Sequence, residues 1–408
     1  MSLVPSGDRN VPSKIVRSEE VVIPKDLQEF LGDIADERHG FRLGDPWKYS
    51  EDALAVVVPI LRAKAPERLY KTMYEELKDL GMKDTGNIDK VALQNKTGVP
   101  LFIRAGTIFT GSTQNRAAEN STVVQPGKSE VNVRCVNQTH GINGGAGMKY
   151  GDIAPVNVTM NLISHAGQTA VWNSVRNYTS GHKEYTVIGG SSYGNSYHAE
   201  SPLEYHNTGD SFYGCFSDPV SYVGKIGRSA RGSSMGSVND NAGCYFNSTV
   251  TDGLVGHSWD NPGSGGSSDL LGYMNKVDAG RDVVNDMLQK VPLFEDQVGA
   301  IVFSPVGVIA IESFEHQMSW AAIKKEVIEK HGDKICNEQA DHLFELRPEK
   351  ILPAFKKFVK GLENGEEHSV RRDDLSETRV VVGKGVIGEY TLVKGRVIHT
   401  IIVRQEDN

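Results

Sequence analysis

Apolar residues in the early part of the chain recur at intervals of three or four, which is the repeat of a helix with one buried face. The clearest run is made of four residues: Leu69, Met73, Leu77 and Leu80. Pro66 precedes the run, as is common in a first helical turn, and Gly81 follows it, as is common after a helix end. We therefore predict a helical amino-terminal region over residues 19–90, preceded by a flexible arm over residues 1–18.

From Val91 onward, apolar and polar residues alternate in short runs that are separated by Gly, Pro and Asn. Alternation with a period of two is the pattern of a strand with one buried face. Short strands at this spacing are typical of antiparallel sandwiches and barrels. We expect strands at residues 99–103, 107–110, 121–124, 131–136, 298–303, 306–311, 380–382, 390–393 and 397–403.

Helical spacing returns in the second half of the chain, between the two groups of strands. The pattern predicts a helix over residues 269–290 and a helical segment over residues 319–362, where Ser319 is placed to cap the first helix. Strand groups on both sides of helices favour one mixed sheet system. The expected fold class is mixed α/β and β-rich, with antiparallel sandwich or barrel-like sheets and flanking helices, and its β-rich domain spans residues 91–403.

Residues 141–268 differ in composition from the rest of the chain. They hold 22 of the 43 glycines but only 15 charged side chains, and Ser, Asn and Tyr are abundant. Apolar runs at 156–163, 170–175 and 184–188 predict short strands among long ordered loops. A surface with so few charges is typical of a covered one. We expect this Gly/Ser/Asn-rich insertion to contact a partner, most simply another copy of the chain.

The overall composition is that of a globular protein, with 38% hydrophobic and 24% charged residues. A net charge of −8 argues against a nucleic-acid partner held by bulk charge. The four cysteines stand far apart, which favours a reducing compartment. We find neither a secretory signal nor an apolar run long enough to cross a bilayer, so we expect a cytoplasmic protein without a membrane partner.

Four potential metal ligands occupy even-numbered positions close together: His198, Glu200, Glu204 and His206. In an extended strand these side chains would share one face, and imidazole with carboxylate is a ligand set suited to zinc or another divalent ion. Pro202 would bend such a strand or confine it to a sheet edge. The alternative is the polar outer face of a half-buried strand.

Glu312, Glu315 and His316 follow a predicted buried strand, a place where catalytic groups are often found. They could act as acid, base or ligand. The alternative is a polar helix entry, where the helix dipole favours a carboxylate. His399 lies in an apolar strand, and we predict a core histidine there.

One stretch is identifiable by its glycines and by a Gln-Asn-Arg trio, followed by a strand that ends in Cys-Val. The positions are Gly106, Gly111, Gln114, Asn115, Arg116, Cys135 and Val136. On these residues the chain resembles the ADP-ribosylglycohydrolase- and rhodanese-phosphatase-associated protein domain family. The resemblance extends over about residues 91–403 and implies a context in ADP-ribose metabolism. The family's acidic positions are Ala105, Thr107 and Asn137 here. If those carboxylates carry proton transfer in relatives, this chain cannot perform it in the same way.

The trio Gln114, Asn115 and Arg116 offers hydrogen-bond donors suited to phosphate, carboxylate or ribose hydroxyls. Equally, such side chains often satisfy backbone carbonyls where a sheet turns. The leading hypothesis is a non-catalytic, β-rich binding or self-assembling protein that forms a homo-oligomer. The alternative is an enzyme or sensor that acts on an ADP-ribose-like or nucleotide-derived ligand through this trio. The sequence names no cofactor.

Overall fold

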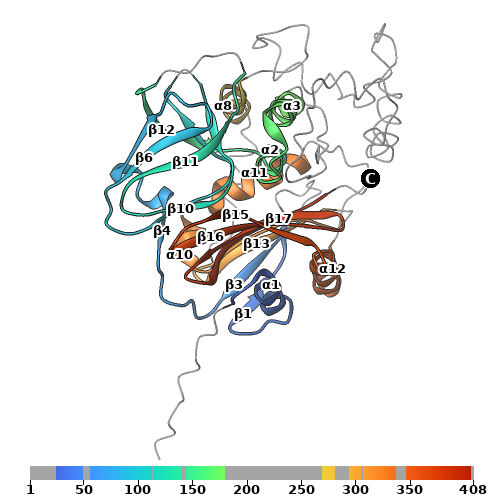
Figure 1. Ribbon diagram of the computed structural model, residues 1–408. Coiled ribbons are helices and arrows are strands. Elements are labelled where there is room, and N and C mark those ends of the chain that lie inside the picture. The colour runs from blue at the N-terminus through green and yellow to red at the C-terminus, as the bar shows by residue number, and fades with distance from the viewer. Residues whose placement is uncertain are drawn as a thin grey trace, which may run out of the picture.

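The computed structural model describes residues 24–48, 56–112, 114–138, 144–179, 269–280, 294–304, 307–336 and 346–405. Over these ranges the protein is mixed α/β and β-rich, with antiparallel sheets, a closed barrel and flanking helices (Figure 1). The fold class that the alternating pattern predicts is therefore confirmed.

The large sheet has nine strands, and every pairing in it is antiparallel. The strands are, in order, β1 (Phe41–Leu43), β3 (Val56–Arg62), β13 (Gln297–Ser304), β14 (Gly307–Phe314), β18 (Arg396–Arg404), β17 (Val386–Val393), β16 (Ser376–Gly383) and β15 (Glu366–Arg372), with β2 (Trp47–Lys48) also on β3. The central strands are near-continuous apolar runs because both faces of the sheet are covered.

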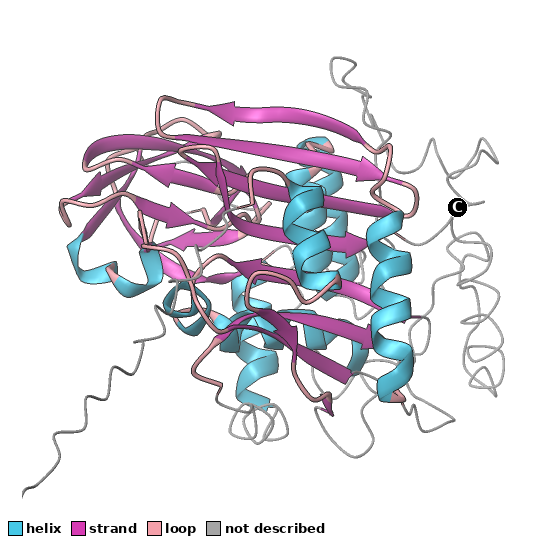
Figure 2. Cartoon of the chain, turned by 90° about the horizontal axis from the view of Figure 1, so that it is seen from below, coloured by secondary structure: helices cyan, strands magenta, loops and turns pink. Residues whose placement is uncertain are grey.

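Helices α1 (Leu27–Ala35) and α12 (Pro348–Lys360) pack on one face of the large sheet (Figure 2). Phe30 of α1 and Phe355 of α12 share a buried cluster with Ile311 of β14. Burial of one such side chain contributes about 1.5–3 kcal/mol to folding. These apolar contacts therefore hold both helices against the sheet.

The opposite face of the large sheet carries helices α10 (Gln317–Ala321) and α11 (Lys324–Cys336), and the barrel lies beyond it (Figure 1). Trp320 of α10 is 1% exposed and shares a buried cluster with Val302 of β13. Helix α2 (Val156–Ile163) lies between the barrel and the large sheet. The sheet and the barrel thus form two layers that enclose α2.

Six strands close the barrel: β11 (Gly127–Cys135), β6 (Lys90–Asn95), β5 (Leu80–Asp84), β12 (Gly147–Ile153), β8 (Thr107–Thr110) and β9 (Arg116–Ala118). A small sheet joins them: β10 (Thr122–Val124), β7 (Leu101–Ile103) and β4 (Lys71–Thr72). Leu101 and Val124 of the small sheet share a buried cluster with Leu93 and Phe109 of the barrel.

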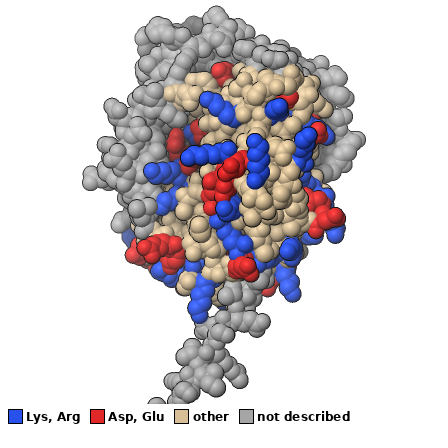
Figure 3. All heavy atoms as spheres, turned by 90° about the vertical axis from the view of Figure 1, so that its left-hand side faces the viewer, with Lys and Arg blue, Asp and Glu red and all other residues tan. Residues whose placement is uncertain are grey.

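On the molecular face that Figure 3 shows, acidic and basic side chains are interspersed, as expected of a solvated surface.

The helical reading of residues 19–90 is wrong for most of the described part of that region. Only α1 is an α-helix there, and the predicted helix around Met73 consists of two short 3₁₀ turns, η1 (Met73–Glu75) and η2 (Leu77–Asp79), followed by β5. Gly81 pairs with Gln94 in the barrel instead of ending a helix. Met73 and Leu80 of the run contact the barrel core, whereas Leu77 is exposed. Pairing of β5 with β6 determines the structure here and overrides the helical spacing.

The insertion shows a second correction. The apolar runs at 156–163 and 170–175 form helices α2 and α3 (Gly167–Thr179), not strands. Every residue of α2 is buried, and its polar residues at positions 157, 159 and 161 alternate with apolar ones, so the helix has the period-two pattern of a strand. The strand predicted at 184–188 lies outside the described residues.

Most predictions for the second half of the chain are confirmed. The hairpin of β13 and β14, the helix α12 and the closing strands β16, β17 and β18 lie where the pattern places them. The predicted helix over 269–290 is present as α8 (Leu270–Gly280). The predicted cap is wrong: His316 caps α10, because its side chain accepts the N–H of Met318, and Ser319 is buried inside the helix. Within the described ranges, no helix is long and apolar enough to span a membrane.

Candidate functional site: a buried charged junction

Two carboxylates stand in one row on the face of the large sheet that looks toward the barrel. Glu312 of β14 and Glu389 of β17 both lie opposite Ile401 of β18, so the three side chains share a face. Glu312 is 1% exposed and Glu389 is fully buried. A buried carboxylate requires partners, and both find them in loops of the barrel layer.

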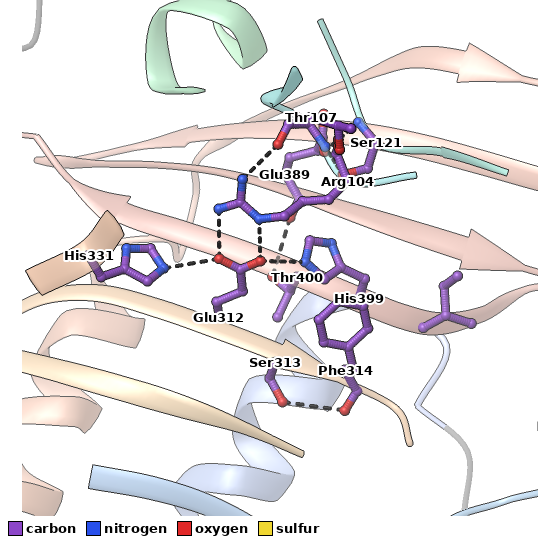
Figure 4. Close-up of polar contacts among 12 residues, drawn as sticks. Arg104, Thr107, Ser121, Glu312, Ser313, Phe314, His331, Glu389, His399 and Thr400 are labelled. Carbon is purple, nitrogen blue, oxygen red and sulfur yellow. Dashed lines mark hydrogen bonds and ion pairs between the residues drawn. The ribbon is translucent and has the colours of Figure 1, made fainter. Parts of the chain in front are cut away.

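Glu312 forms a bidentate ion pair with Arg104, which directly follows β7 (Figure 4). The Nε atom of Arg104 lies 2.6 Å from Oε1, and its Nη2 atom lies 2.8 Å from Oε2. The third nitrogen, Nη1, donates to the carbonyl of Ala105 at 2.7 Å. The parallel geometry of guanidinium and carboxylate is the strongest arrangement that such a pair adopts.

Two histidines complete the shell around Glu312 (Figure 4). Nε2 of His331, on α11, lies 3.0 Å from one carboxylate oxygen, and Nε2 of His399, on β18, lies 3.1 Å from the other. The ring of His399 packs against Phe102 and Phe314 at centroid distances of 4.8 and 4.5 Å. His399 is fully buried, which confirms the prediction of a core histidine.

Glu389 has no basic partner among its hydrogen bonds. It accepts the backbone N–H of Ser121 and the amide of Asn120, each at 2.9 Å. Burial raises the pKa of Glu389, and these hydrogen bonds offset that effect only in part. Burial acts in the same direction on Glu312, but Arg104 and the two imidazoles outweigh it and hold the pKa of Glu312 well below its usual range.

The two carboxylates therefore predict opposite pH dependences of stability. The folded pKa of Glu389 is above the unfolded value of about 4.3, so stability is lost as pH rises through that window. We expect the stability of Glu389→Gln relative to the unmodified protein to increase between pH 4 and pH 7, measured by urea unfolding. Glu312→Gln should be less stable than the unmodified protein at neutral pH, and this deficit should shrink as pH falls through and below the unfolded pKa of about 4.3, because the stability from a lowered pKa is lost there. Parallel curves for the two variants would contradict this assignment.

A tight turn at Gly106 places Arg104 for this pairing. Gly106 has a φ of +79°, and its N–H and carbonyl bond to Ala118 and Ala154, both at 2.8 Å. A Cβ atom at this position would lie 2.5 Å from Oγ1 of Thr159 and 3.3 Å from Nη1 of Arg104. The glycine is thus required both by the backbone conformation and by the approach of α2.

We expect Gly106→Ala to lower the unfolding free energy by about 2–4 kcal/mol, because a left-handed backbone and a steric overlap add. Gly98→Ala is the matched control, since Gly98 has a φ of +76° with nothing within 4 Å of the added Cβ. The control should lose only about 1–2 kcal/mol, the backbone contribution. Urea denaturation measures both, and equal losses would show that α2 does not press on the turn.

A second buried ion pair accounts for Arg116 of the predicted trio. The side chains of Arg116 and Asp84 are fully buried, and Nη2 lies 2.7 Å from the carboxylate. Nη1 donates to the carbonyls of Asn87 and Lys90 at 2.8 and 3.0 Å. Burial raises the pKa of Asp84, but hydrogen bonds from Ser112, from a backbone N–H and from Arg116 outweigh it and lower the pKa. Arg116 thus holds a turn of the barrel, which is the structural alternative considered for it.

The two amides of the trio contact protein groups as well. Gln114 is buried and donates to the carbonyl of Asn137 at 3.3 Å. Asn115, which is half-buried, accepts from Thr110 at 2.6 Å and donates to Asp269 at 3.2 Å. Gln114 and Asn115 thus contact Asn137 and Asp269, whereas Arg116 contacts the turn at Asp84, and binding of a ligand by these residues stays a prediction.

The remaining candidates divide between described and undescribed regions. His198, Glu200, Glu204 and His206 lie outside the described residues, and in the described ranges no three potential ligands gather as a metal site would require. Glu315 is fully buried and forms a bidentate ion pair with Arg396 at 2.8 and 2.9 Å. His316 is the cap of α10, in agreement with a polar helix entry.

Sequence reasoning missed Arg104, His331 and Glu389 as members of one site. A signal was present for Arg104, which interrupts the apolar run of β7 just before a glycine. Its partner lies 208 residues further along the chain, so no local pattern connects the two. The pairing follows only from the docking of the barrel on the sheet.

Fold and junction together define a class of protein: a β-rich scaffold in which a barrel is locked to a large antiparallel sheet by buried charges. A scan against known families matches residues 40–217 and 259–403 to the ARG and Rhodanese-Phosphatase-superfamily-associated Protein domain. The chain belongs to this family. No curated protein and no solved structure matches the chain.

Proposed function

We propose that the protein is a non-catalytic binding protein that assembles with copies of itself through the charge-poor segment between α3 and α8. The observation that carries the proposal is composition: residues 180–268, which lie between α3 and α8, hold only 12 charged side chains among 89 residues, in a chain that is 24% charged overall. Charged side chains are depleted in the cores of protein interfaces, where aromatic residues are enriched. Seven of the 14 tyrosines of the chain lie in this segment.

The attachment of the segment to the body supports the proposal. Tyr178 near the end of α3 and Tyr273 in α8 make an edge-to-face contact with ring centroids 5.5 Å apart, so the segment leaves and re-enters the body at one place. Gln168 of α3 bonds the N–H and the carbonyl of Cys135 in β11 at 3.0 and 2.7 Å. Because α3 and α8 anchor both ends of the segment to the body of the protein, the residues between them can form a binding surface.

The buried ion pairs in the described part of the chain favour a binding role over a catalytic one. Catalytic acids and bases must reach a substrate, and they usually lie in a cleft. Glu312 and Arg104, like Asp84 and Arg116, are enclosed and bonded to each other. Their arrangement is suited to holding layers together.

Native mass spectrometry and light scattering of the full chain test the assembly. We expect an oligomer at micromolar concentration, and a monomer when residues 181–267 are replaced by a short Gly/Ser linker. Because the ends of the segment meet, the linker variant should keep the circular dichroism spectrum expected of its β-rich body. A monomeric full chain, or a linker variant that still assembles, would refute the proposal.

The family description favours a second candidate, because it associates the family with ARG proteins. The ligand would be an ADP-ribose-like molecule bound through the trio of Gln114, Asn115 and Arg116. Calorimetric titration with ADP-ribose tests it, with Asn115→Ala as the variant, since Asn115 is half-buried and its loss leaves the Asp84–Arg116 pair intact. Absence of heat with the unmodified protein would eliminate this candidate.

A further inference from the structure

Helix α2 buries two of its faces by apolar contacts with different layers. One face joins the large sheet through Val156, Met160 and Ile163. A second joins the barrel through Val158 and Leu162. Successive residues in a helix are roughly 100° apart, so a third face remains, on which Asn157 and Asn161 lie one turn from each other.

The third face carries amide groups that lack hydrogen bonds. Asn157 and Asn161 are each 1% exposed. Neither polar atom of the Asn157 side chain has a partner, nor has Oδ1 of Asn161, while Nδ2 of Asn161 donates to the carbonyl of Asn157 at 3.0 Å. Among the side chains that the structure describes, only Asn157 has two polar atoms buried without a partner.

Asn157 lies at a helix end that has no side-chain cap. The N-cap position of α2 is Pro155, which supplies no side-chain hydrogen bond. The first N–H groups of any helix have no carbonyl partner within the helix, and helical side chains lean toward the amino end. Asn157, in the first turn, therefore adds its amide to a group of backbone donors.

A buried amide without partners costs about 1–3 kcal/mol, and native proteins usually satisfy such a group with a bound molecule or with water. The amide donors and acceptors that lack partners restrict the class of ligand. Two acceptor oxygens, on Asn157 and Asn161, require donors, while Nδ2 of Asn157 requires an acceptor. Phosphate supplies mainly acceptors, and the helix dipole disfavours a cation at this end. Hydroxyl groups supply both a donor and an acceptor.

We propose that the third face of α2 binds adjacent hydroxyl groups of a small neutral polyhydroxylated molecule, with Asn157 and Asn161 as the residues that recognise them. Nucleoside ribose and free carbohydrate share this chemistry. The site is separate from the trio of Gln114, Asn115 and Arg116 and does not depend on self-assembly.

The first experiment is native mass spectrometry of the purified full chain, because a ligand enclosed at residues 1% exposed should survive purification. The second is titration with methyl β-D-ribofuranoside and with methyl α-D-glucopyranoside, monitored by ligand-detected NMR. Binding of the ribofuranoside identifies a nucleoside-derived ligand, and binding of the glucopyranoside identifies a carbohydrate. A 2-deoxy ribofuranoside, which lacks one of the adjacent hydroxyls, should bind at least about tenfold more weakly.

Asn157→Leu tests the residue itself. Removal of an unpaired buried amide should not destabilise the ligand-free protein, so the variant should remain folded while binding weakens at least about tenfold. Asn95→Leu is the matched structural control, because Asn95 is 2% exposed but donates to the carbonyls of Val99 and Val124 at 2.8 and 3.3 Å. The control should lose stability and keep its affinity for the glycoside.

Two results would overturn the proposal. One is a native mass equal to that of the polypeptide or its multiples, together with no binding of either glycoside. The other is a glycoside affinity that Asn157→Leu leaves unchanged. In the first case the amides are satisfied by water alone, and Asn157→Leu should then raise the melting temperature.

Discussion

Replacement of Arg104 by methionine is expected to lower the unfolding free energy by about 3–5 kcal/mol, the cost of breaking a buried ion pair from one side. The change leaves the Glu312 carboxylate in the interior without its cation, and the two neighbouring imidazoles cannot replace the two bonds of 2.6 and 2.8 Å that it loses. Urea denaturation at pH 7, followed by tryptophan fluorescence, measures the loss.

The matched control for Arg104→Met is an exposed ion pair. Lys356 and Asp36 lie 2.9 Å apart, but their side chains are 49% and 47% exposed. Exposed pairs contribute little to stability because water screens them, so Lys356→Met should change the unfolding free energy far less than Arg104→Met does. The double variant Arg104→Met with Glu312→Gln should recover part of the loss, because no unpaired charge remains inside. A loss below about 1 kcal/mol for Arg104→Met would show that the junction does not hold the layers together.

Arg116→Met is expected to lower the unfolding free energy by a similar amount, about 3–5 kcal/mol, whether or not a ligand is present. The variant leaves the buried Asp84 carboxylate without its cation and removes the donor from the carbonyls of Asn87 and Lys90. Urea denaturation with and without ADP-ribose measures it. The result bears on the trio, because a folding defect would also abolish ligand binding and imitate a binding residue.

The partner substitution separates the two roles of Arg116. Adding Asp84→Asn to Arg116→Met removes the unpaired carboxylate, so part of the stability should return. If ADP-ribose binds and the restored protein no longer binds it, Arg116 contacts the ligand. If Arg116→Met alone unfolds at the same urea concentration as the unmodified protein, the structural role described for this residue is wrong.

The part of the fold that the sequence could predict is the part governed by local periodicity. The hairpin of β13 and β14 and the strands β16, β17 and β18 alternate or run apolar in the expected way, and glycine or proline separates several of them. Proline at the start of α12 fits a first helical turn, because a proline there gives up an N–H that would be unpaired in any case. His399 could be placed in the core because its neighbours in the strand are apolar.

The rest depended on contacts between distant segments. The run that contains Met73 has helical spacing, yet barrel closure through the pairing of β5 with β6 decides its structure. Helix α2 is buried on every side and its polar residues alternate with apolar ones, so periodicity indicates a strand there. Arg104 follows β7, and the other members of this shell come from β14, α11 and β18, so their proximity depends on how the layers pack.

The position of β18 has a consequence for the order in which the protein can fold during synthesis. This strand is the last in the described chain, yet it lies inside the large sheet, between β14 and β17. The barrel strands, from β5 to β12, are contiguous in the sequence, so the barrel can close before the rest of the chain is synthesised. In the large sheet, β3 cannot pair with β13, nor β14 with β18, until those later strands have been made. Long-range pairing of this kind slows folding and leaves apolar strand edges open to aggregation while synthesis continues. The large sheet therefore stays incomplete until β18 has left the ribosome, and we expect the nascent chain to bind chaperones until then.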